Sequence, residues 1–121
     1  HNADGGYGSG SNVTVQNALA RSLNTIPARI IINMIGIDKS YDYLVNKYHI
    51  TTAVESSDKS AAPLSIGSMT YGATSLEMTA AYAAFGNGGY YYKPYSFYYI
   101  EDANGRILID NRNNKGEQPR L

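Results

Sequence analysis

The sequence of 121 residues contains no cysteine and no tryptophan, and it has only two histidines, His1 and His49. The absence of cysteine excludes disulfide bridges, thiol catalysis and thiolate zinc sites. Two histidines are a poor supply for a histidine metal site or for a Ser-His-Asp triad. Apolar runs are short as well, and none approaches the ~18 residues that a membrane span needs.

The chain also lacks an excess of charge of either sign. Ten Lys and Arg balance ten Asp and Glu, so the net charge is zero. This balance argues against a nucleic-acid-binding protein with a basic face and against an acidic solvating tail. What the sequence has in excess is tyrosine, since six of its 12 tyrosines fall between Tyr90 and Tyr99. The length fits one domain, and the absence of an initial Met and of a signal peptide suggests an excised segment or a mature piece.

The distribution of residues predicts three regions. Residues 1–12 hold four glycines and two serines without periodicity, which is typical of a flexible linker. Residues 13–110 carry the apolar periodicity of a folded domain. Residues 111–121 form a polar tail, which we expect to fray.

The first structured block predicts two helices separated by a tight break. Thr14 can cap the first helix, whose apolar residues recur at helical spacing from Val15 to Leu23. A second helix is expected to begin near Pro27, with Asn24 or Thr25 as its cap, and to end at Gly36. Asp38 is then expected to cap a third helix that extends to about Tyr48.

The second half predicts a loop, a helix and a hairpin, in that order. Residues 51–71, rich in small polar residues, are expected to form a long loop. Thr74 and Glu77 are spaced as a capping box for a helix that Gly86–Gly89 should stop. Residues 90–100 are expected to form a strand, and Asn104-Gly105 is typical of the turn of a hairpin. The predicted class is therefore α+β, mostly helical with a C-terminal β-hairpin. Because two strands make no stable sheet, we expect the chain to be part of a larger fold.

A Ser-x-Asn triplet, Ser22-Leu23-Asn24, falls at the break between the first two helices. A hydroxyl and a carboxamide placed there can both face a cleft, where one relays a proton and the other binds a substrate amide. The alternative is structural, because Ser at a helix end and Asn at a cap are common. The triplet alone does not decide between the two interpretations.

Other patterns are weaker candidates for chemistry. Residues 56–59 fit S-x-x-K, but that motif needs its serine at the start of a helix, and here a polar loop is expected. Glu101-Asp102 lies beside the expected turn and is interpreted as solvated. The tyrosine-rich segment could bind glycan or peptide, although a cross-strand aromatic ladder is the favoured interpretation. His49 is interpreted as the C-terminal residue of a helix.

Two longer stretches give the triplet a context. VTVQNALARSLNTIPARI resembles the segment around the second motif of penicillin-binding protein transpeptidase domains. LSIGSMTYGATSLEMTAAYAAFGNGGYYYKP is similar to a later segment of the same family, and the IEDANGRIL hairpin follows where the family has one. The resemblance is to the class A, bifunctional members and covers about residues 4–111. It implies part of the fold that these transpeptidases share with serine β-lactamases.

The resemblance also implies a function and a site. The family cleaves the terminal D-Ala-D-Ala bond of a peptidoglycan stem peptide, transfers the acyl group to a neighbouring amine, and is acylated by β-lactams. Ser22 would carry a proton between the lysine of S-x-x-K and the amine, and Asn24 would hold that lysine and the substrate amide. No cofactor, metal or nucleic acid is implied. The parent would act at the extracytoplasmic face of the bacterial membrane.

The departures from the family pattern matter as much as the match. S-x-x-K should precede S-x-N and K-[ST]-G should follow the hairpin, yet neither is found in those places. We therefore expect the isolated chain to be inactive and to expose apolar surface through which it self-associates. Three alternatives stay open. The first is a D,D-carboxypeptidase or β-lactamase-like hydrolase on the same fold, the second is a tyrosine-rich, non-catalytic module that binds glycan or peptide, and the third is a catalytically dead parent that only scaffolds.

Overall fold

A computed structural model describes residues 12–117 of the chain. The expected linker, residues 1–12, therefore lies outside the described residues except for Asn12. The helices are α1 (Val15–Ala20), α2 (Thr25–Ile30), α3 (Ile37–Asp42), α4 (Glu55–Asp58), α5 (Ala61–Ile66) and α6 (Ser75–Gly86), with π-helical turns η1 (Ile31–Ile35) and η2 (Tyr43–Lys47) continuing α2 and α3. The strands are β1 (Tyr99–Glu101) and β2 (Ile107–Asp110).

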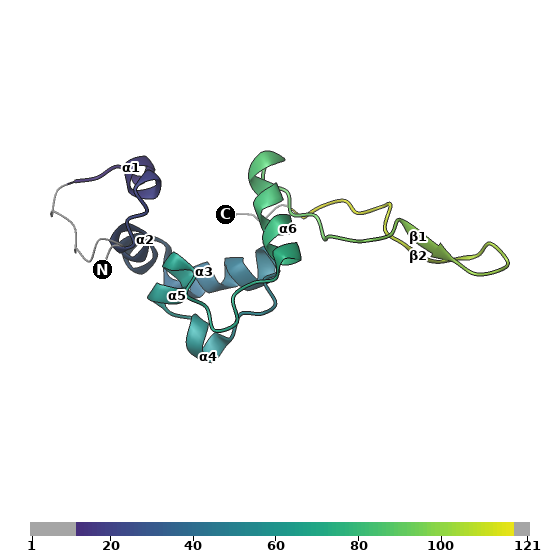
Figure 1. Cartoon of the computed structure of the whole chain (residues 1–121), viewed down its shortest axis with the longest axis horizontal. Helices are drawn as coiled ribbons and strands as arrows, with labels where there is room; N and C mark the ends of the chain where they lie inside the picture. The colour runs from purple at the N-terminus through teal and green to yellow at the C-terminus, as the bar shows by residue number, and fades with distance from the viewer. Residues whose placement is uncertain (1–11, 118–121) are drawn as a thin grey trace.

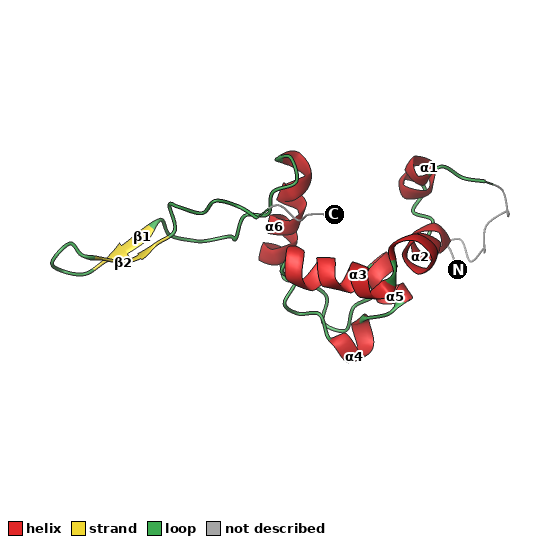
Figure 2. Ribbon diagram, turned by 180° about the vertical axis from the view of Figure 1, so that it is seen from behind, coloured by secondary structure: helices red, strands yellow, loops and turns green. Residues whose placement is uncertain are grey.

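The molecule consists of a bent helical body and a long arm (Figures 1 and 2). The segments α1 and α2 lie at one end of the body, α6 stands at the other, and the β1–β2 hairpin extends beyond α6. Helix α5 packs against α2, η1 and α3. Within residues 12–117, no helix has both the length and the apolar character needed to cross a membrane.

The start of α1 and the end of the second helical run follow the sequence signals, but α1 ends at Ala20, short of the expected Leu23, because the chain turns at Ser22. Thr14 caps α1, because its Oγ1 accepts a hydrogen bond from the backbone N of Asn17 at 3.2 Å. The helical run that begins at Thr25 ends at Gly36, whose φ of +90° suits a residue without Cβ. Asn24 stands at the cap position of α2, but its side chain makes no capping hydrogen bond.

The expected cap of the third helix is wrong by two residues. Helix α3 begins at Ile37 after Gly36, so Asp38 lies inside its first turn. A carboxylate in the first turn still interacts favourably with the positive end of the helix. Asp38 therefore marks the start of this helix correctly, although it is not the cap.

The expected loop over residues 51–71 is also wrong, because α4 and α5 lie within it. Asp58 holds this segment together, and its side chain is almost completely buried. The carboxylate accepts hydrogen bonds from the backbone N atoms of Val54 (2.9 Å) and Thr70 (2.8 Å) and from Thr70 Oγ1 (2.7 Å). The pKa of Asp58 is lowered, and the hydrogen bond from the Val54 backbone N–H is the largest cause. One buried carboxylate therefore ties both ends of this segment together, which a pattern of apolar spacing cannot reveal.

The hairpin is confirmed, but it is shorter than the predicted strand. Strands β1 and β2 pair antiparallel around Asn104-Gly105, with a bulge at Ile100/Glu101. Asp102 shapes the turn, because its Oδ1 accepts hydrogen bonds from the backbone N atoms of Asn104 and Arg106, both at 2.9 Å. This is the local role that Asp has in turns, and it agrees with the interpretation that Glu101-Asp102 is no acid–base pair.

Most of residues 90–98 run extended without a ladder, contrary to the predicted strand. They pair instead with the residues that were expected to fray. Tyr91 and Glu117 exchange two backbone hydrogen bonds of 2.7 and 2.6 Å, and Asn114 Nδ2 donates to the carbonyl of Lys93 at 2.8 Å. The expectation of fraying is therefore wrong for residues 111–117, since backbone groups rather than apolar side chains hold this segment.

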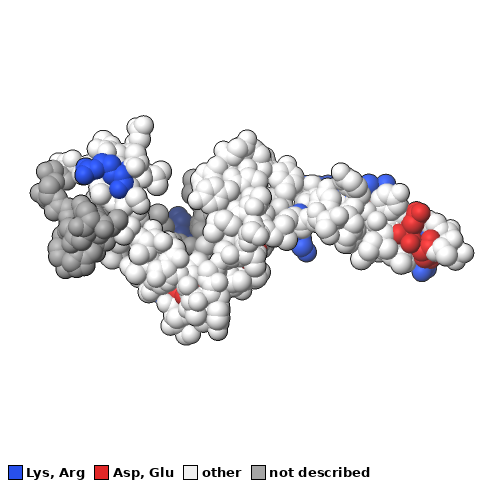
Figure 3. All heavy atoms as spheres, in the orientation of Figure 1, with Lys and Arg blue, Asp and Glu red and all other residues white. Residues whose placement is uncertain are grey.

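The core is small and much apolar surface is exposed, as expected. The buried apolar residues are Ala18, Ile31, Ile50, Ala80, Ala84 and Tyr91. By contrast, Leu19 on α1 and Phe85 on α6 are 78% and 80% exposed. Helix α6 buries Ala80 and Ala84 and exposes larger apolar residues such as Phe85. In the view of Figure 3, the visible face of the body carries few charges, and acidic side chains gather near the end of the arm.

Candidate functional site

The break between α1 and α2 has a defined geometry that centres on Ser22. The backbone N of Ser22 donates to the carbonyl of Leu19 at 3.0 Å, and the N of Leu23 donates to the carbonyl of Ala18 at 2.9 Å. These two bonds form a Schellman motif, which closes a helix by placing one residue in the left-handed conformation. Ser22 is that residue, with a φ of +53°. Its side chain is exposed.

A serine at this position is unusual on physical grounds. Glycine normally occupies the left-handed place of the motif, because a Cβ there crowds the following carbonyl oxygen at a cost of roughly 1–2 kcal/mol. Ser22 bears that cost and projects a hydroxyl from the turn. Backbone strain of this kind is concentrated at functional sites.

Asn24 lies two residues further on, half-buried, at the start of α2. Helix α2, which Asn24 precedes, packs against α5. The structure thus places both predicted site residues in one short turn between two helices. A cavity of about 250 Å³ lies between the residues that precede α1 and one side of α2 and η1, and neither Ser22 nor Asn24 lines it. Its lining residues are Asn12, Val13, Ile26, Arg29, Ile30, Asn33 and Met34.

The S-x-x-K match at residues 56–59 lies on α4 and its C-cap. It was rejected because a loop was expected there, and that expectation is wrong. The conclusion survives for a different reason. Lys59 Nζ pairs with Glu55 Oε1 at 2.9 Å and with Asp38 Oδ1 at 3.0 Å. The hydrogen bond to Glu55, followed by that to Asp38, raises the pKa of Lys59. A lysine held protonated in this way is unsuited to act as a general base.

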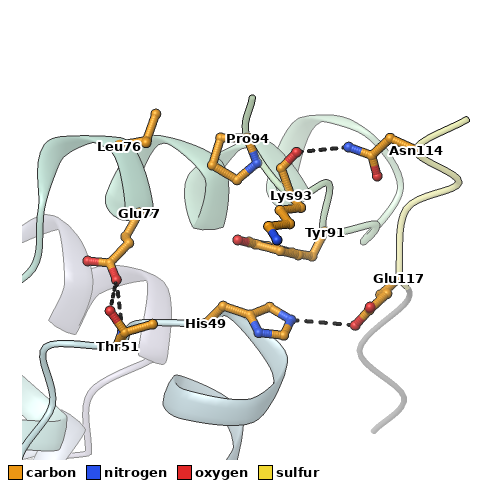
Figure 4. Close-up of a pocket in the computed structure, with 9 residues that line it drawn as sticks. All are labelled: His49, Thr51, Leu76, Glu77, Tyr91, Lys93, Pro94, Asn114 and Glu117. Carbon is orange, nitrogen blue, oxygen red and sulfur yellow. Dashed lines mark hydrogen bonds and ion pairs between the residues drawn. The ribbon is translucent and has the colours of Figure 1, made fainter. Parts of the chain in front are cut away.

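A second concave site lies where α6 meets the arm (Figure 4). It has a volume of about 580 Å³ and is lined by His49, Thr51, Leu76, Glu77, Tyr91, Lys93, Pro94, Asn114 and Glu117. His49 was predicted only as a helix-terminal residue, but it has a left-handed φ of +53° and directs its ring at Tyr91. The two ring centres are 4.6 Å apart, and His49 Nε2 lies 3.4 Å from Glu117 Oε2.

Glu77 dominates the electrostatics of this second site. One carboxylate oxygen accepts from Thr51 N (2.9 Å) and Oγ1 (2.6 Å), and the other accepts from Thr74 N (3.1 Å) and Oγ1 (2.8 Å). Thr74 Oγ1 in turn accepts from Glu77 N, which completes the predicted capping box. These bonds, led by that from the Thr51 hydroxyl, lower the pKa of Glu77 to about 2. Its acceptor positions are used to anchor α6, so we interpret Glu77 as structural.

The tyrosines form pairs rather than one flat platform. Tyr91 is buried in the core, whereas Tyr95 and Tyr98 contact each other edge to face at 6.1 Å near the base of the hairpin. Arg112 lies 4.6 Å from the ring centre of Tyr99 and also binds Asp110. These internal contacts favour aromatic packing over a ligand-binding surface. Among the described residues, no group of three or more His, Cys, Asp or Glu is arranged to hold a metal ion.

Comparison with known proteins gives a consistent result. The family model described as the penicillin binding protein transpeptidase domain matches residues 1–120. Penicillin-binding protein 4 of Bacillus subtilis is 36% identical over 96 residues, which cover 79% of this chain and 15% of that protein.

Two further relatives are named penicillin-binding protein 1A. That of Streptococcus pneumoniae is 37% identical over 78% of the chain, and that of Clostridium botulinum is 32% identical over 84% of it. The chain spans only 13% and 12% of the lengths of these two proteins. The match to the family model over nearly the whole sequence shows that the chain belongs to the penicillin-binding protein transpeptidase family.

Proposed function

We propose that this chain supplies the S-x-N element of a peptidoglycan D,D-transpeptidase of the class A type, with Ser22 and Asn24 as its catalytic residues. The parent protein would have the serine acyl-transferase fold that is shared with β-lactamases. It would act outside the cytoplasmic membrane, because its substrate, the stem peptide of peptidoglycan, lies there. Family membership supports the reaction class.

In the proposed reaction, the nucleophile is the serine of an S-x-x-K motif that lies elsewhere in the parent. Its Oγ forms a bond to the carbonyl carbon of the penultimate D-Ala, and the C–N bond to the terminal D-Ala breaks. The hydroxyl proton moves by way of the lysine and Ser22 to the leaving amine. The amine of a neighbouring peptide then attacks the ester carbonyl carbon, a new amide bond forms, the ester C–Oγ bond breaks, and the proton of the amine returns to the serine Oγ. Asn24 would donate hydrogen bonds to the substrate amide and hold the lysine.

One observation carries this assignment beyond the motif match. Ser22 occupies the left-handed position of a Schellman motif, where glycine would be less strained, and its hydroxyl is exposed at the turn. A purely structural residue at that place would relieve the strain. A hydroxyl that takes part in proton transfer accounts for why the strained residue is there.

The test uses the full-length parent protein and a fluorescent penicillin. We expect Ser22→Ala and Asn24→Ala to slow acylation by about 100-fold or more, the size typical of losing a general acid–base group. Ser57→Ala is the matched control, because the Ser57 hydroxyl contacts Thr70 Oγ1 at 2.6 Å in a different part of the body. Acylation of Ser22→Ala at the wild-type rate would refute the assignment.

The isolated 121-residue chain provides a second test. We expect no covalent labelling by the same penicillin, because the members of a coupled catalytic set act together. Stoichiometric labelling of this chain would show that a serine within it is the nucleophile, which contradicts the proposed division of the site.

A further inference from the structure

Within residues 12–117, helix α1, which leads into Ser22, makes few contacts with the other helices and strands. It is six residues long, and helices this short do not persist in water without outside contacts. Ala18 is its one buried residue, while Val15 and Leu19 are mostly exposed. Among the described residues, the hydrogen bonds at the two ends of α1 are therefore contacts that fix the turn at Ser22.

Those two ends are linked by a chain of hydrogen bonds through Ala18. Thr14 Oγ1 accepts from Asn17 N at 3.2 Å, and the carbonyl of Thr14 accepts from Ala18 N at 2.9 Å. The carbonyl of the same Ala18 accepts from Leu23 N, which is the bond that closes the turn around Ser22. Loss of the cap would let the first turn of α1 fray, and a helix with fewer than two turns has no second turn to keep Ala18 in place.

We propose that Thr14 is a positioning residue for Ser22: its side chain fixes α1, and α1 fixes the left-handed turn that presents the Ser22 hydroxyl. The inference rests on the proposed function of Ser22. Thr14 touches neither substrate nor reacting atoms in this scheme. It acts only by keeping the turn in the one conformation that aims the hydroxyl.

The chain offers a matched control at another helix. Thr74 caps α6 with the same geometry, because its Oγ1 accepts from Glu77 N at 3.2 Å. Thr14→Ala and Thr74→Ala each delete a capping hydroxyl, and Thr74→Ala also removes the bond from Thr74 Oγ1 to Glu77 Oε2, so it is the larger structural change. Only Thr14→Ala deletes the cap of the helix that leads into Ser22. Any effect of general destabilisation should appear in both variants.

The experiment measures acylation of the full-length protein at 25 °C by stopped-flow with a chromogenic β-lactam. It separates the first-order acylation rate constant from the affinity of the initial complex. We expect Thr14→Ala to lower the rate constant by about five-fold, the equivalent of one lost cap, with the initial affinity unchanged. Thr14→Ser, which keeps the capping oxygen, should restore the rate to within about two-fold. Thr74→Ala should acylate at the wild-type rate.

Each contrary result has a distinct meaning. If Thr14→Ala acylates normally while Ser22→Ala is slow, the positioning role is refuted and the proposed function stands. If Thr74→Ala is as slow as Thr14→Ala, or if Thr14→Ser does not restore the rate, the effect is general and the positioning role is refuted. If Ser22→Ala itself acylates normally, the proposed function fails and the role of Thr14 fails with it.

Discussion

Replacing Ser22 by glycine and by alanine separates strain from chemistry. Both variants lack the hydroxyl, but they differ at the backbone. Alanine keeps a Cβ at a φ of +53° and so keeps the strain, whereas glycine adopts this conformation freely. The pair therefore measures what the left-handed turn costs the folded protein.

The expected difference follows from two opposing effects. Relief of the left-handed conformation favours the glycine variant by about 1–2 kcal/mol. The greater freedom of glycine in the unfolded chain opposes this by about 0.4–1 kcal/mol. The net expectation is that Ser22→Gly is more stable than Ser22→Ala by about 0.5–1 kcal/mol. In a protein of several hundred residues this corresponds to a difference in Tm of about 0.5–1.5 °C.

The assay is thermal unfolding of both variants and of the unmodified full-length protein under the same buffer and scan rate. We expect the Tm of Ser22→Gly to exceed that of Ser22→Ala. A Tm for the alanine variant equal to or above that of the glycine variant would refute the reasoning, because it would mean that the turn imposes no strain. Gly36→Ala, at a φ of +90°, is a positive control that should be destabilised.

Three further predictions follow from other parts of the structure. Because hydrogen bonding lowers the pKa of Glu77 from 4.5 to about 2, its stabilisation is complete above about pH 4.5 and is lost as the pH falls toward 2. The amide nitrogen of Glu77→Gln cannot accept a hydrogen bond, so this variant should lower the free energy of unfolding by about 1–2 kcal/mol at pH 7. It should also flatten the pH–stability curve between pH 4.5 and 2, as measured by denaturant unfolding. Asp58→Asn should loosen residues 54–70, so trypsin should cleave after Lys59 about ten-fold faster. An unchanged cleavage rate would contradict the role of Asp58. The isolated chain, with Leu19 and Phe85 largely exposed, should self-associate in sedimentation velocity, and a clean monomer at high concentration would count against this.

Local signals in the sequence predicted some helix ends and missed others, such as the end of α1 and the start of α3. Thr14, Gly36 and the Thr74–Glu77 capping box all act where their spacing placed them. These features depend on neighbours three or four residues away, so the sequence contains all that is needed to recognise them. The Asn104-Gly105 turn succeeded for the same reason.

Features that depend on distant partners were missed. Asp58 organises α4 and α5 through Thr70, and Glu77 reaches back to Thr51 across 26 residues. His49 forms the second concave site with Tyr91 and Glu117, which lie far away in sequence. No periodicity marks such contacts, because a single buried polar side chain has no repeat. An acidic residue inside a Ser- and Thr-rich stretch is the one local signal that could have suggested a hydrogen-bonded centre rather than a loop.

The pair of variants at Ser22 also decides why a serine is there at all. Natural proteins keep strained residues only where the surrounding structure compensates for them, and removing the strain at a functional residue usually gains stability while losing activity. If the hydroxyl transfers protons, Ser22→Gly should be the more stable variant and yet acylate as slowly as Ser22→Ala. If the serine is merely tolerated, the glycine variant should be both more stable and fully reactive. Stability and acylation measured on the same two proteins therefore distinguish a catalytic turn from an ordinary helix end.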